Sequence, residues 1–268
     1  MEWLGGIIIM AEKKIINSLV KALKILECFS IETKELRLTD IAKMLDMPKS
    51  TASNLIYTME SMGYIEQNKD NGKFKLGTKL FILGKAFEYH IDIIEIARPY
   101  MEKLRNKFNE NIQLSMPYDE NGIVEGICVE KAREFNTVSV NSRVGGKIPL
   151  HCTASGKLFL SSMDNETLYK TLDKIELFKR TENTITDKNV LKEDILRVKN
   201  QGYAMAIEEG ELGITSIAVP IYEYNSQFIA SLSIAAPSVR LSGEIGYEII
   251  NDLLKSAKDI SEKLGYKK

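Results

Sequence analysis

Residues 38–76 are LTDIAKMLDMPKSTASNLIYTMESMGYIEQNKDNGKFKL, and they carry the clearest structural signals in this chain. Their pattern predicts a short helix, a tight turn, a second helix and a β-hairpin. Thr39 is the expected N-cap of the first helix. Pro48 suits the first turn of the second helix, because it lacks an N–H that would have no partner there. Asp70-Asn71-Gly72 is expected to supply the positive φ values of the hairpin turn.

The second of these helices has an apolar face and an unusual polar face. Five apolar residues recur at helical spacing and are expected to face a core: Ala52, Leu55, Ile56, Met59 and Met62. The opposite face carries Ser50, Asn54, Tyr57 and Ser61, with Thr51 and Ser53 beside it. A solvated helix face normally carries Glu and Lys, whereas short hydrogen-bonding side chains approach base edges and phosphates closely. The arrangement indicates a helix that lies in a DNA groove, with the hairpin as a wing.

On the return strand of the hairpin, Phe74 and Leu76 are expected to point inward and Lys73 and Lys75 outward. A basic hairpin beside a recognition helix suits a phosphate backbone or a minor groove. Taken alone, these lysines are better explained as a solubilising edge. Residues 14–77 hold 10 Lys/Arg and 8 Asp/Glu, a net charge of +2. DNA binding would therefore depend on local arrangement and not on a strongly basic domain.

A further amphipathic helix is expected before this stretch, completing a three-helix core. Its apolar residues are Ile15, Leu19, Leu23, Leu26, Cys28 and Phe29. After the hairpin, residues 78–91 are expected to form a linker helix. Its apolar stripe is Leu80, Phe81, Leu83, Gly84 and Phe87, and we favour pairing with a second copy over burial in a domain core.

Composition excludes several classes of protein. The 268 residues carry a net charge of −1, which argues against a polybasic protein. Three cysteines without C-x-x-C spacing and two histidines leave no credible zinc site or disulfide framework, so we expect a cytoplasmic protein without metal or cofactor. Residues 3–10 are apolar but too short to span a bilayer, and they lack a signal cleavage site. Met10 is a candidate initiator, which the intact mass of the native protein would test.

Residues 92–268 are expected to form an α+β domain with one central antiparallel sheet. A helix over residues 93–108 precedes strands at 112–116, 123–130 and 137–141. Helices then begin near Thr153, after Asp164 and at Thr186 or Asp187, and strands return at 203–207, 216–221 and 228–235. A long helix through Ile245 and Leu264 closes the chain. The predicted domains are therefore an extension at 1–13, a DNA-binding domain at 14–77, a linker at 78–91 and a second domain at 92–268.

The segment SRVGGKIPLHCTASGK, residues 142–157, is the most unusual part of the second domain. Small residues at Thr153-Ala154-Ser155-Gly156 open a helix whose amides and dipole favour a carboxylate or phosphate. An N-cap packed tightly against a sheet explains the local sequence equally well. His151 and Cys152 suggest a nucleophile and its base, but neighbours on an extended segment point to opposite faces. We therefore expect no catalysis.

Eight segments together resemble the IclR family of bacterial transcription regulators. They are SLVKALKILECFS, LTDIAKMLDMPKSTASNLIYTMESMGYI, GKFKLG, ARPYMEKL, SRVGGKIPLHCTASGK, NTITD, RVKNQGYAMAIEEGELGITSIAVPI and SLSIAAPSVRL. The resemblance implies a winged helix-turn-helix domain, a linker helix and a GAF-like effector-binding domain. It also implies a homodimer or dimer of dimers that binds double-stranded DNA at a pseudo-palindromic operator, often repressing a catabolic operon until a small organic acid binds.

The resemblance also assigns site residues. For DNA contact they are Lys49, Ser50, Thr51, Asn54 and Tyr57, with Lys73 and Lys75 on the wing. For the effector they are the amides of Ala154 and Ser155, the positions of Ala206, Ser216, Ser233 and Ala235, and an apolar wall of Val140, Ile148 and Ile214.

Two effector positions depart from the family pattern, because Asp is common where Ala206 stands and Ser where Ala235 stands. A ligand with a polar atom at either position would leave it unpaired, at about 1–3 kcal/mol each. The departures therefore favour a bulkier carboxylate, a sugar acid or an aromatic acid, over glyoxylate or pyruvate.

Two other functions remain open at this point. One is a metabolic enzyme with a winged helix used for protein contacts. The other is an architectural DNA-binding protein with an empty sensor domain, which Ala206 and Ala235 suggest.

Overall fold

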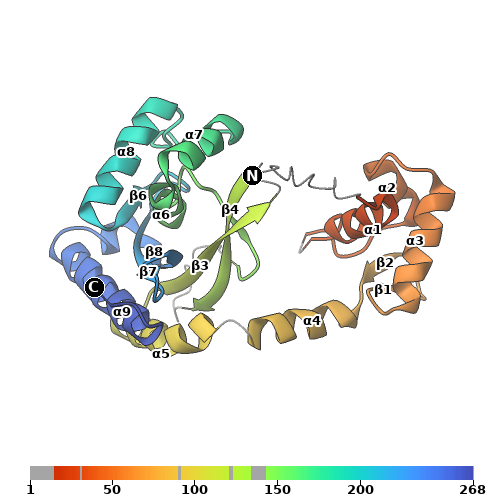
Figure 1. Ribbon diagram of the computed structural model, residues 1–268, viewed down its shortest axis with the longest axis horizontal. Coiled ribbons are helices and arrows are strands. Elements are labelled where there is room, and N and C mark those ends of the chain that lie inside the picture. The colour runs from red at the N-terminus through yellow and green to blue at the C-terminus, as the bar shows by residue number, and fades with distance from the viewer. Residues whose placement is uncertain (1–14, 31, 90–91, 121–122, 134–142, 268) are drawn as a thin grey trace, which may run out of the picture. The chain divides into compact units, whose positions relative to one another are not determined.

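The computed structural model describes residues 15–30, 32–89, 92–120, 123–133 and 143–267. The chain divides into two compact units, residues 1–90 and residues 91–268 (Figure 1). The extension at 1–13, with the candidate initiator Met10, lies outside the described residues, as do the expected strand at 137–141 and Val140.

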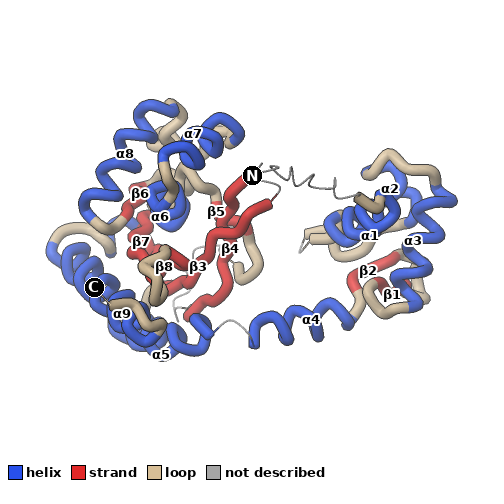
Figure 2. Tube along the Cα trace, viewed as in Figure 1, coloured by secondary structure: helices blue, strands red, loops and turns tan. Residues whose placement is uncertain are grey.

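Among the described residues, the first unit contains three helices, a β-hairpin and a fourth helix that follows the hairpin (Figure 2). Their bounds are α1 Asn17–Glu27, α2 Leu38–Met44, α3 Lys49–Ser61, β1 Ile65–Gln67, β2 Phe74–Leu76 and α4 Thr78–Tyr89. The two strands are antiparallel, with Gln67 opposite Phe74, and Leu36 forms a bridge to Phe74 from the other side. Ile25, Ile41, Ile56 and Phe74 are buried together in the core. This order and this core are those of a winged helix-turn-helix.

Several local predictions in this unit are wrong. Arg37, not Thr39, precedes α2, and its N–H donates to the Asp40 carboxylate at 3.2 Å. Pro48 is the N-cap of α3 and lies one residue before its first turn. Within the expected turn Asp70-Asn71-Gly72, Gly72 alone has a positive φ. Asn side chains hold the turn instead, because Asn68 accepts from Asp70 N–H and Asn71 from Lys73 N–H.

Some residues expected in the core are exposed. Met62 is 61% exposed because it follows the last turn of α3, and Leu76 is 43% exposed at the end of β2. The expected stripe of the first helix is only partly buried: Leu19 is 57% exposed and Ile15 and Leu23 are also exposed, whereas Leu26, Cys28 and Phe29 pack in the core as predicted. Ala22 and Ile25 of α1 pack inward where Leu19 and Leu23 were expected.

The second unit is an α+β domain, as predicted from the sequence. Its elements are α5 Asp92–Phe108, β3 Asn111–Glu120, β4 Ile123–Ala132, β5 Lys147–Ile148, α6 Ala154–Ser162, α7 Asn165–Lys174, α8 Lys188–Gln201, β6 Ala204–Ile207, β7 Ile214–Tyr222, β8 Phe228–Pro237, a 3₁₀ turn at Ser238–Arg240 and α9 Glu244–Lys263. The strands form one antiparallel sheet in the order β5-β4-β3-β8-β7-β6.

The two faces of this sheet differ in the size of their side chains. Helices α5 and α9 cover one face, where Ile112, Leu232 and Ile234 belong to the main core (Figure 1). Helix α6 packs on the other face against small residues such as Ala204 and Ala218. Small side chains let α6 approach the sheet, and the space beside its first turn forms the cavity described below. Across the described residues, no helix has the length and apolar character that crossing a membrane requires.

Candidate DNA-reading surface and effector cavity

The outward face of α3 is open. Lys49, Ser50, Asn54 and Tyr57 are exposed and Thr51 is half-buried. The Tyr57 ring packs edge-on against Phe74 of the wing, with ring centroids 6.0 Å apart. Among the described residues of the first unit, no strand covers this face. The short polar side chains are therefore presented to solvent, as a groove-binding helix requires.

The wing is less basic than its two lysines suggest. Lys75 is exposed, but its Nζ lies 3.4 Å from a carboxylate oxygen of Glu66, while Lys73 is half-buried. Glu66 also accepts hydrogen bonds from the N–H and the hydroxyl of Thr78, both at 3.0 Å, and these bonds lower the pKa of its carboxyl group. The charge of Lys75 on the wing is therefore locally balanced by Glu66.

In the second unit, a cavity of about 340 Å³ lies at the first turn of α6. Eight of the nine predicted effector residues line it: Ile148, Ala154, Ser155, Ala206, Ile214, Ser216, Ser233 and Ala235. The ninth, Val140, is not among the described residues. Residues from four strands and the start of a helix thus meet at one place, although they are far apart in the sequence.

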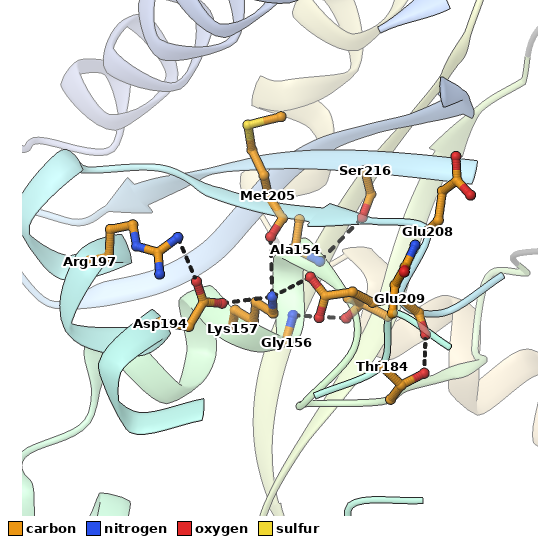
Figure 3. A network of polar contacts seen from close by, with 12 residues as sticks. Ala154, Gly156, Lys157, Thr184, Asp194, Arg197, Met205, Glu208, Glu209 and Ser216 are labelled. Atoms are coloured by element: carbon orange, nitrogen blue, oxygen red, sulfur yellow. Dashed lines mark hydrogen bonds and ion pairs between the residues drawn. The ribbon is translucent and has the colours of Figure 1, made fainter. Parts of the chain in front are cut away.

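The amides of the α6 first turn are not equally available. Thr153 is the N-cap, and its hydroxyl accepts from Gly156 N–H at 3.0 Å and donates to the Pro149 carbonyl at 2.7 Å. The Ala154 N–H donates to the Ser216 hydroxyl at 3.3 Å (Figure 3). Within the described residues, the Ser155 N–H has no hydrogen-bond partner. The Ser155 N–H and the hydroxyl proton of Ser216 are therefore the two donors that remain to bind an anion.

Two lining residues that the sequence reasoning missed are Gln113 and Arg180. Gln113 lies on β3, directly opposite Ser233 on β8. A polar residue between Ile112 and Leu114 was a visible signal that one side of this strand faces something other than a hydrophobic core. Arg180 lies in the irregular segment between α7 and α8, where no periodic pattern reveals which way a side chain points.

The sequence reasoning also left Lys157 without a role, although it is only 1% exposed. Its Nζ lies 2.7 Å from Asp194 Oδ2 and 2.5 Å from Glu209 Oε1, and it donates to the Met205 carbonyl at 3.4 Å (Figure 3). The Glu209 carbonyl in turn accepts from the Thr184 hydroxyl at 2.7 Å. Because the next two residues, Gly210 and Glu211, line the cavity, this buried ionic cluster fixes part of the cavity wall.

His151 and Cys152 do not form a nucleophile and base. Both are buried, and His151 Nε2 lies 3.0 Å from the Phe178 carbonyl oxygen. Burial lowers the pKa of His151 and raises that of the Cys152 thiol to about 11. A protonated, buried thiol is a poor nucleophile. Among the described residues, no cluster of His, Cys, Asp or Glu could hold a metal ion.

The same chemistry predicts that the cysteines are unreactive in the folded protein. Burial raises the pKa of Cys28, and it raises those of Cys128 and Cys152 to about 11, so all three stay protonated at pH 8. Titration with a chromogenic disulfide reagent should label three thiols in denaturant and react only slowly without it. Fast labelling of Cys152 in the native protein would contradict this and would reopen a catalytic role.

A winged helix-turn-helix with an open recognition helix, joined to an α+β unit with a partly polar cavity, defines a DNA-binding regulator with a ligand-sensing domain. Comparison with known protein families supports this class. Residues 18–69 match the IclR helix-turn-helix domain, and residues 87–262 match the C-terminal domain of the bacterial transcriptional regulator IclR. The chain belongs to the IclR family, and it is a transcriptional regulator and not an enzyme.

Individual relatives align over nearly the whole chain. The HTH-type transcriptional regulator KdgR of Escherichia coli is 33% identical, over 94% of this chain and 94% of its own. The transcriptional repressor IclR of the same species is 26% identical, over 93% and 90%. A crystal structure of an IclR homolog from Microbacterium hydrocarbonoxydans, complexed with 4-hydroxybenzoate, superposes with a TM-score of 0.80 at 27% identity, covering 92% of this chain and 98% of the homolog.

Proposed function

We propose that this protein represses a catabolic operon and that a small carboxylate-bearing metabolite, bound in the second unit, controls its DNA binding. The observation that carries the proposal is the pairing of an uncovered α3 face with a cavity at the α6 first turn. A relative named as a transcriptional repressor supports repression. We place the protein in the cytoplasm, where bacterial DNA lies, and assign residues 14–77 to DNA binding, 78–91 to a linker and 92–268 to the effector.

On DNA, we propose that α3 lies in the major groove. Ser50, Thr51, Asn54 and Tyr57 contact base edges and nearby phosphates, since each presents a short or planar hydrogen-bonding group. Lys49 contacts phosphate at the start of the helix, and Lys73 and Lys75 do so on the wing. The small excess of positive charge in this unit makes local arrangement, and not net charge, the source of affinity.

In the cavity, we propose that a carboxylate binds the Ser155 N–H at the positive end of α6, with Ala154 and Ser216 beside it. Ile148 and Ile214 form an apolar wall, to which we also assign Val140 by the family resemblance, and Ala206, Ser233 and Ala235 form the floor. The homolog that binds the carboxylate 4-hydroxybenzoate supports this class of effector. The ligand acts by binding the DNA-competent and incompetent arrangements with different affinity, and a coupling of about 1–3 kcal/mol is sufficient for a switch.

Two copies are required if the operator is pseudo-palindromic. Exposed apolar side chains on α4 provide a surface for pairing, namely Phe81, Ile82 and Leu83, while the side chain of Phe87 is not described. We therefore propose a homodimer, or a dimer of dimers, that uses α4 and the exposed stripe of α1.

Phe81→Glu tests this pairing. A charge in a buried apolar interface is costly, so the variant should form smaller assemblies than the parent at the same concentration. Sedimentation velocity measures this, with exposed Tyr224→Glu in the second unit as a control for surface charge. An unchanged sedimentation coefficient for Phe81→Glu would argue against α4 as the interface.

The regulatory proposal is tested by gel-shift on the DNA upstream of the protein's own gene, with organic acids added to the preformed complex. A specific complex at low salt that at least one acid dissociates or strengthens is the expected result. No shift on any upstream fragment would contradict the proposal.

A further inference from the structure

We propose that Gln113 recognises the hydroxyl groups of the effector and Arg180 its carboxylate, and that the effector is a polyhydroxylated monocarboxylate, an acid of the aldonic type. This inference rests on the effector function proposed above and narrows its chemistry. The two residues are outside the set that the family resemblance assigns, and both line the cavity.

Three polar side chains that line the cavity have no hydrogen-bond partner among the described residues. Gln113, Ser155 and Ser233 are 8%, 6% and 5% exposed, and all three line the cavity. In the described residues, none of their side chains makes a hydrogen bond. A buried polar group is costly unless it is paired. A ligand that fills the cavity therefore has to offer hydrogen-bonding groups to all three side chains.

The positions of these groups distinguish between acids. Gln113 and Ser233 lie opposite each other on neighbouring strands, and Ser216 lies on the next strand, with its hydroxyl proton not used by the Ala154 bond. Hydroxyls on successive carbons of a ligand chain would meet this row of donors and acceptors. An aromatic ring would displace water from these side chains without forming hydrogen bonds to them. Pyruvate is too short to reach all three.

The charges along the cavity point to a single carboxylate. Lys147 lies 3.6 Å from Glu125, whereas Arg180 has no carboxylate partner in the described part of the chain. Glu211 also lines the cavity and would repel a second negative group. Arg180 is therefore the lining cation that has no ion-pair partner among the described residues and that can bind one carboxylate.

Arg180 is also held in place. The Thr184 hydroxyl accepts from the N–H groups of Arg180 and Thr181, at 3.1 and 2.8 Å, and the guanidinium lies 5.0 Å from the Phe178 ring centre. His151 contacts the carbonyl oxygen of that same Phe178. Through Phe178 and His151, the segment that carries Arg180 is therefore linked to the segment that precedes α6.

Titration calorimetry of the full chain with D-gluconate, pyruvate and 4-hydroxybenzoate tests the proposal. D-gluconate should bind most tightly. Gln113→Leu should weaken D-gluconate by about tenfold, which corresponds to about 1.4 kcal/mol, and leave the other two acids within about twofold. Arg180→Gln should weaken all three acids by about tenfold.

Matched controls separate these effects from general damage. Ser115→Ala removes a buried hydroxyl from the same side of β3, outside the cavity, and should change D-gluconate affinity by less than about twofold. Lys147→Gln removes a cation that already has a partner and should have a smaller effect than Arg180→Gln. Gln113→Met, of similar length, replaces Gln113→Leu if the latter melts at a lower temperature without ligand.

Tighter binding of 4-hydroxybenzoate than of D-gluconate would overturn the inference and leave the regulatory proposal standing. Equal losses of affinity for all three acids in Gln113→Leu would also overturn the inference and leave the regulatory proposal standing. If none of the three binds, the inference fails, and the regulatory proposal is decided separately by whether any other acid changes the gel-shift.

Discussion

Lys157→Met should lower the free energy of unfolding by about 3–5 kcal/mol, because it removes the cation from a buried ionic cluster. Two carboxylates, those of Asp194 and Glu209, would remain with little solvent contact. Asp194 keeps a 3.5 Å contact with the exposed Arg197, so Glu209 bears most of the cost. Urea denaturation followed by circular dichroism measures the change.

The loss should be smaller at pH 5 than at pH 8. Burial raises the pKa of Glu209, so the folded protein binds this proton more tightly than the unfolded chain does. Such a group stabilises the fold most below its unfolded pKa, and that contribution is lost as the pH rises through the folded value. Without Lys157 the pKa of Glu209 in the folded protein rises further. At pH 5 more of the folded variant then carries a protonated Glu209, so the substitution costs less stability there than at pH 8.

Two further variants control for the nature of the change. Lys170→Met removes an exposed lysine paired with Glu166, and it should alter stability by less than about 0.5 kcal/mol. Adding Asp194→Asn and Glu209→Gln to Lys157→Met should recover part of the loss, because no buried charge then lacks a partner. Equal effects for Lys157→Met and Lys170→Met would contradict the role given to the cluster.

Asn54→Glu should reduce affinity for the operator by about a hundredfold, since it places a carboxylate at the centre of the outward α3 face, against phosphates and base edges. The residue is exposed, so the fold should be unchanged. Fluorescence anisotropy with labelled upstream DNA measures the affinity.

Asn189→Glu is the matched control for this variant. It adds the same charge at an exposed position of α8, in the other unit, and should bind DNA within about twofold of the parent. If both variants lose affinity equally, net charge and not the α3 face would be responsible.

The elements of this protein were largely predictable because their signals are local. Gly63 and Gly202 end helices with positive φ, and Asp164 and Asp187 cap helices by accepting from their first-turn amides. Alternation and turn residues likewise located the long strands of the sheet. The family resemblance brought together eight cavity residues that no local pattern could join.

The failures have physical reasons as well. Helix α1 contains two apolar stripes at helical spacing, and only packing chooses the one at Ala22 and Ile25. Met62 and Leu76 end their elements, where periodicity no longer decides burial. Lys157 and Gln113 were missed because their partners lie far away in the sequence, which spacing alone does not reveal. Arg180 was missed because it lies in an irregular segment, where no periodic pattern shows which way a side chain points.

If the outward face of α3 contacts DNA, footprints of the parent protein and of Asn54→Glu on the upstream region of the gene should differ. The parent should protect two half-sites about one helical turn apart, and Asn54→Glu should protect neither. Unchanged protection by Asn54→Glu, or no protected site for the parent at low salt, would show that this face does not read DNA.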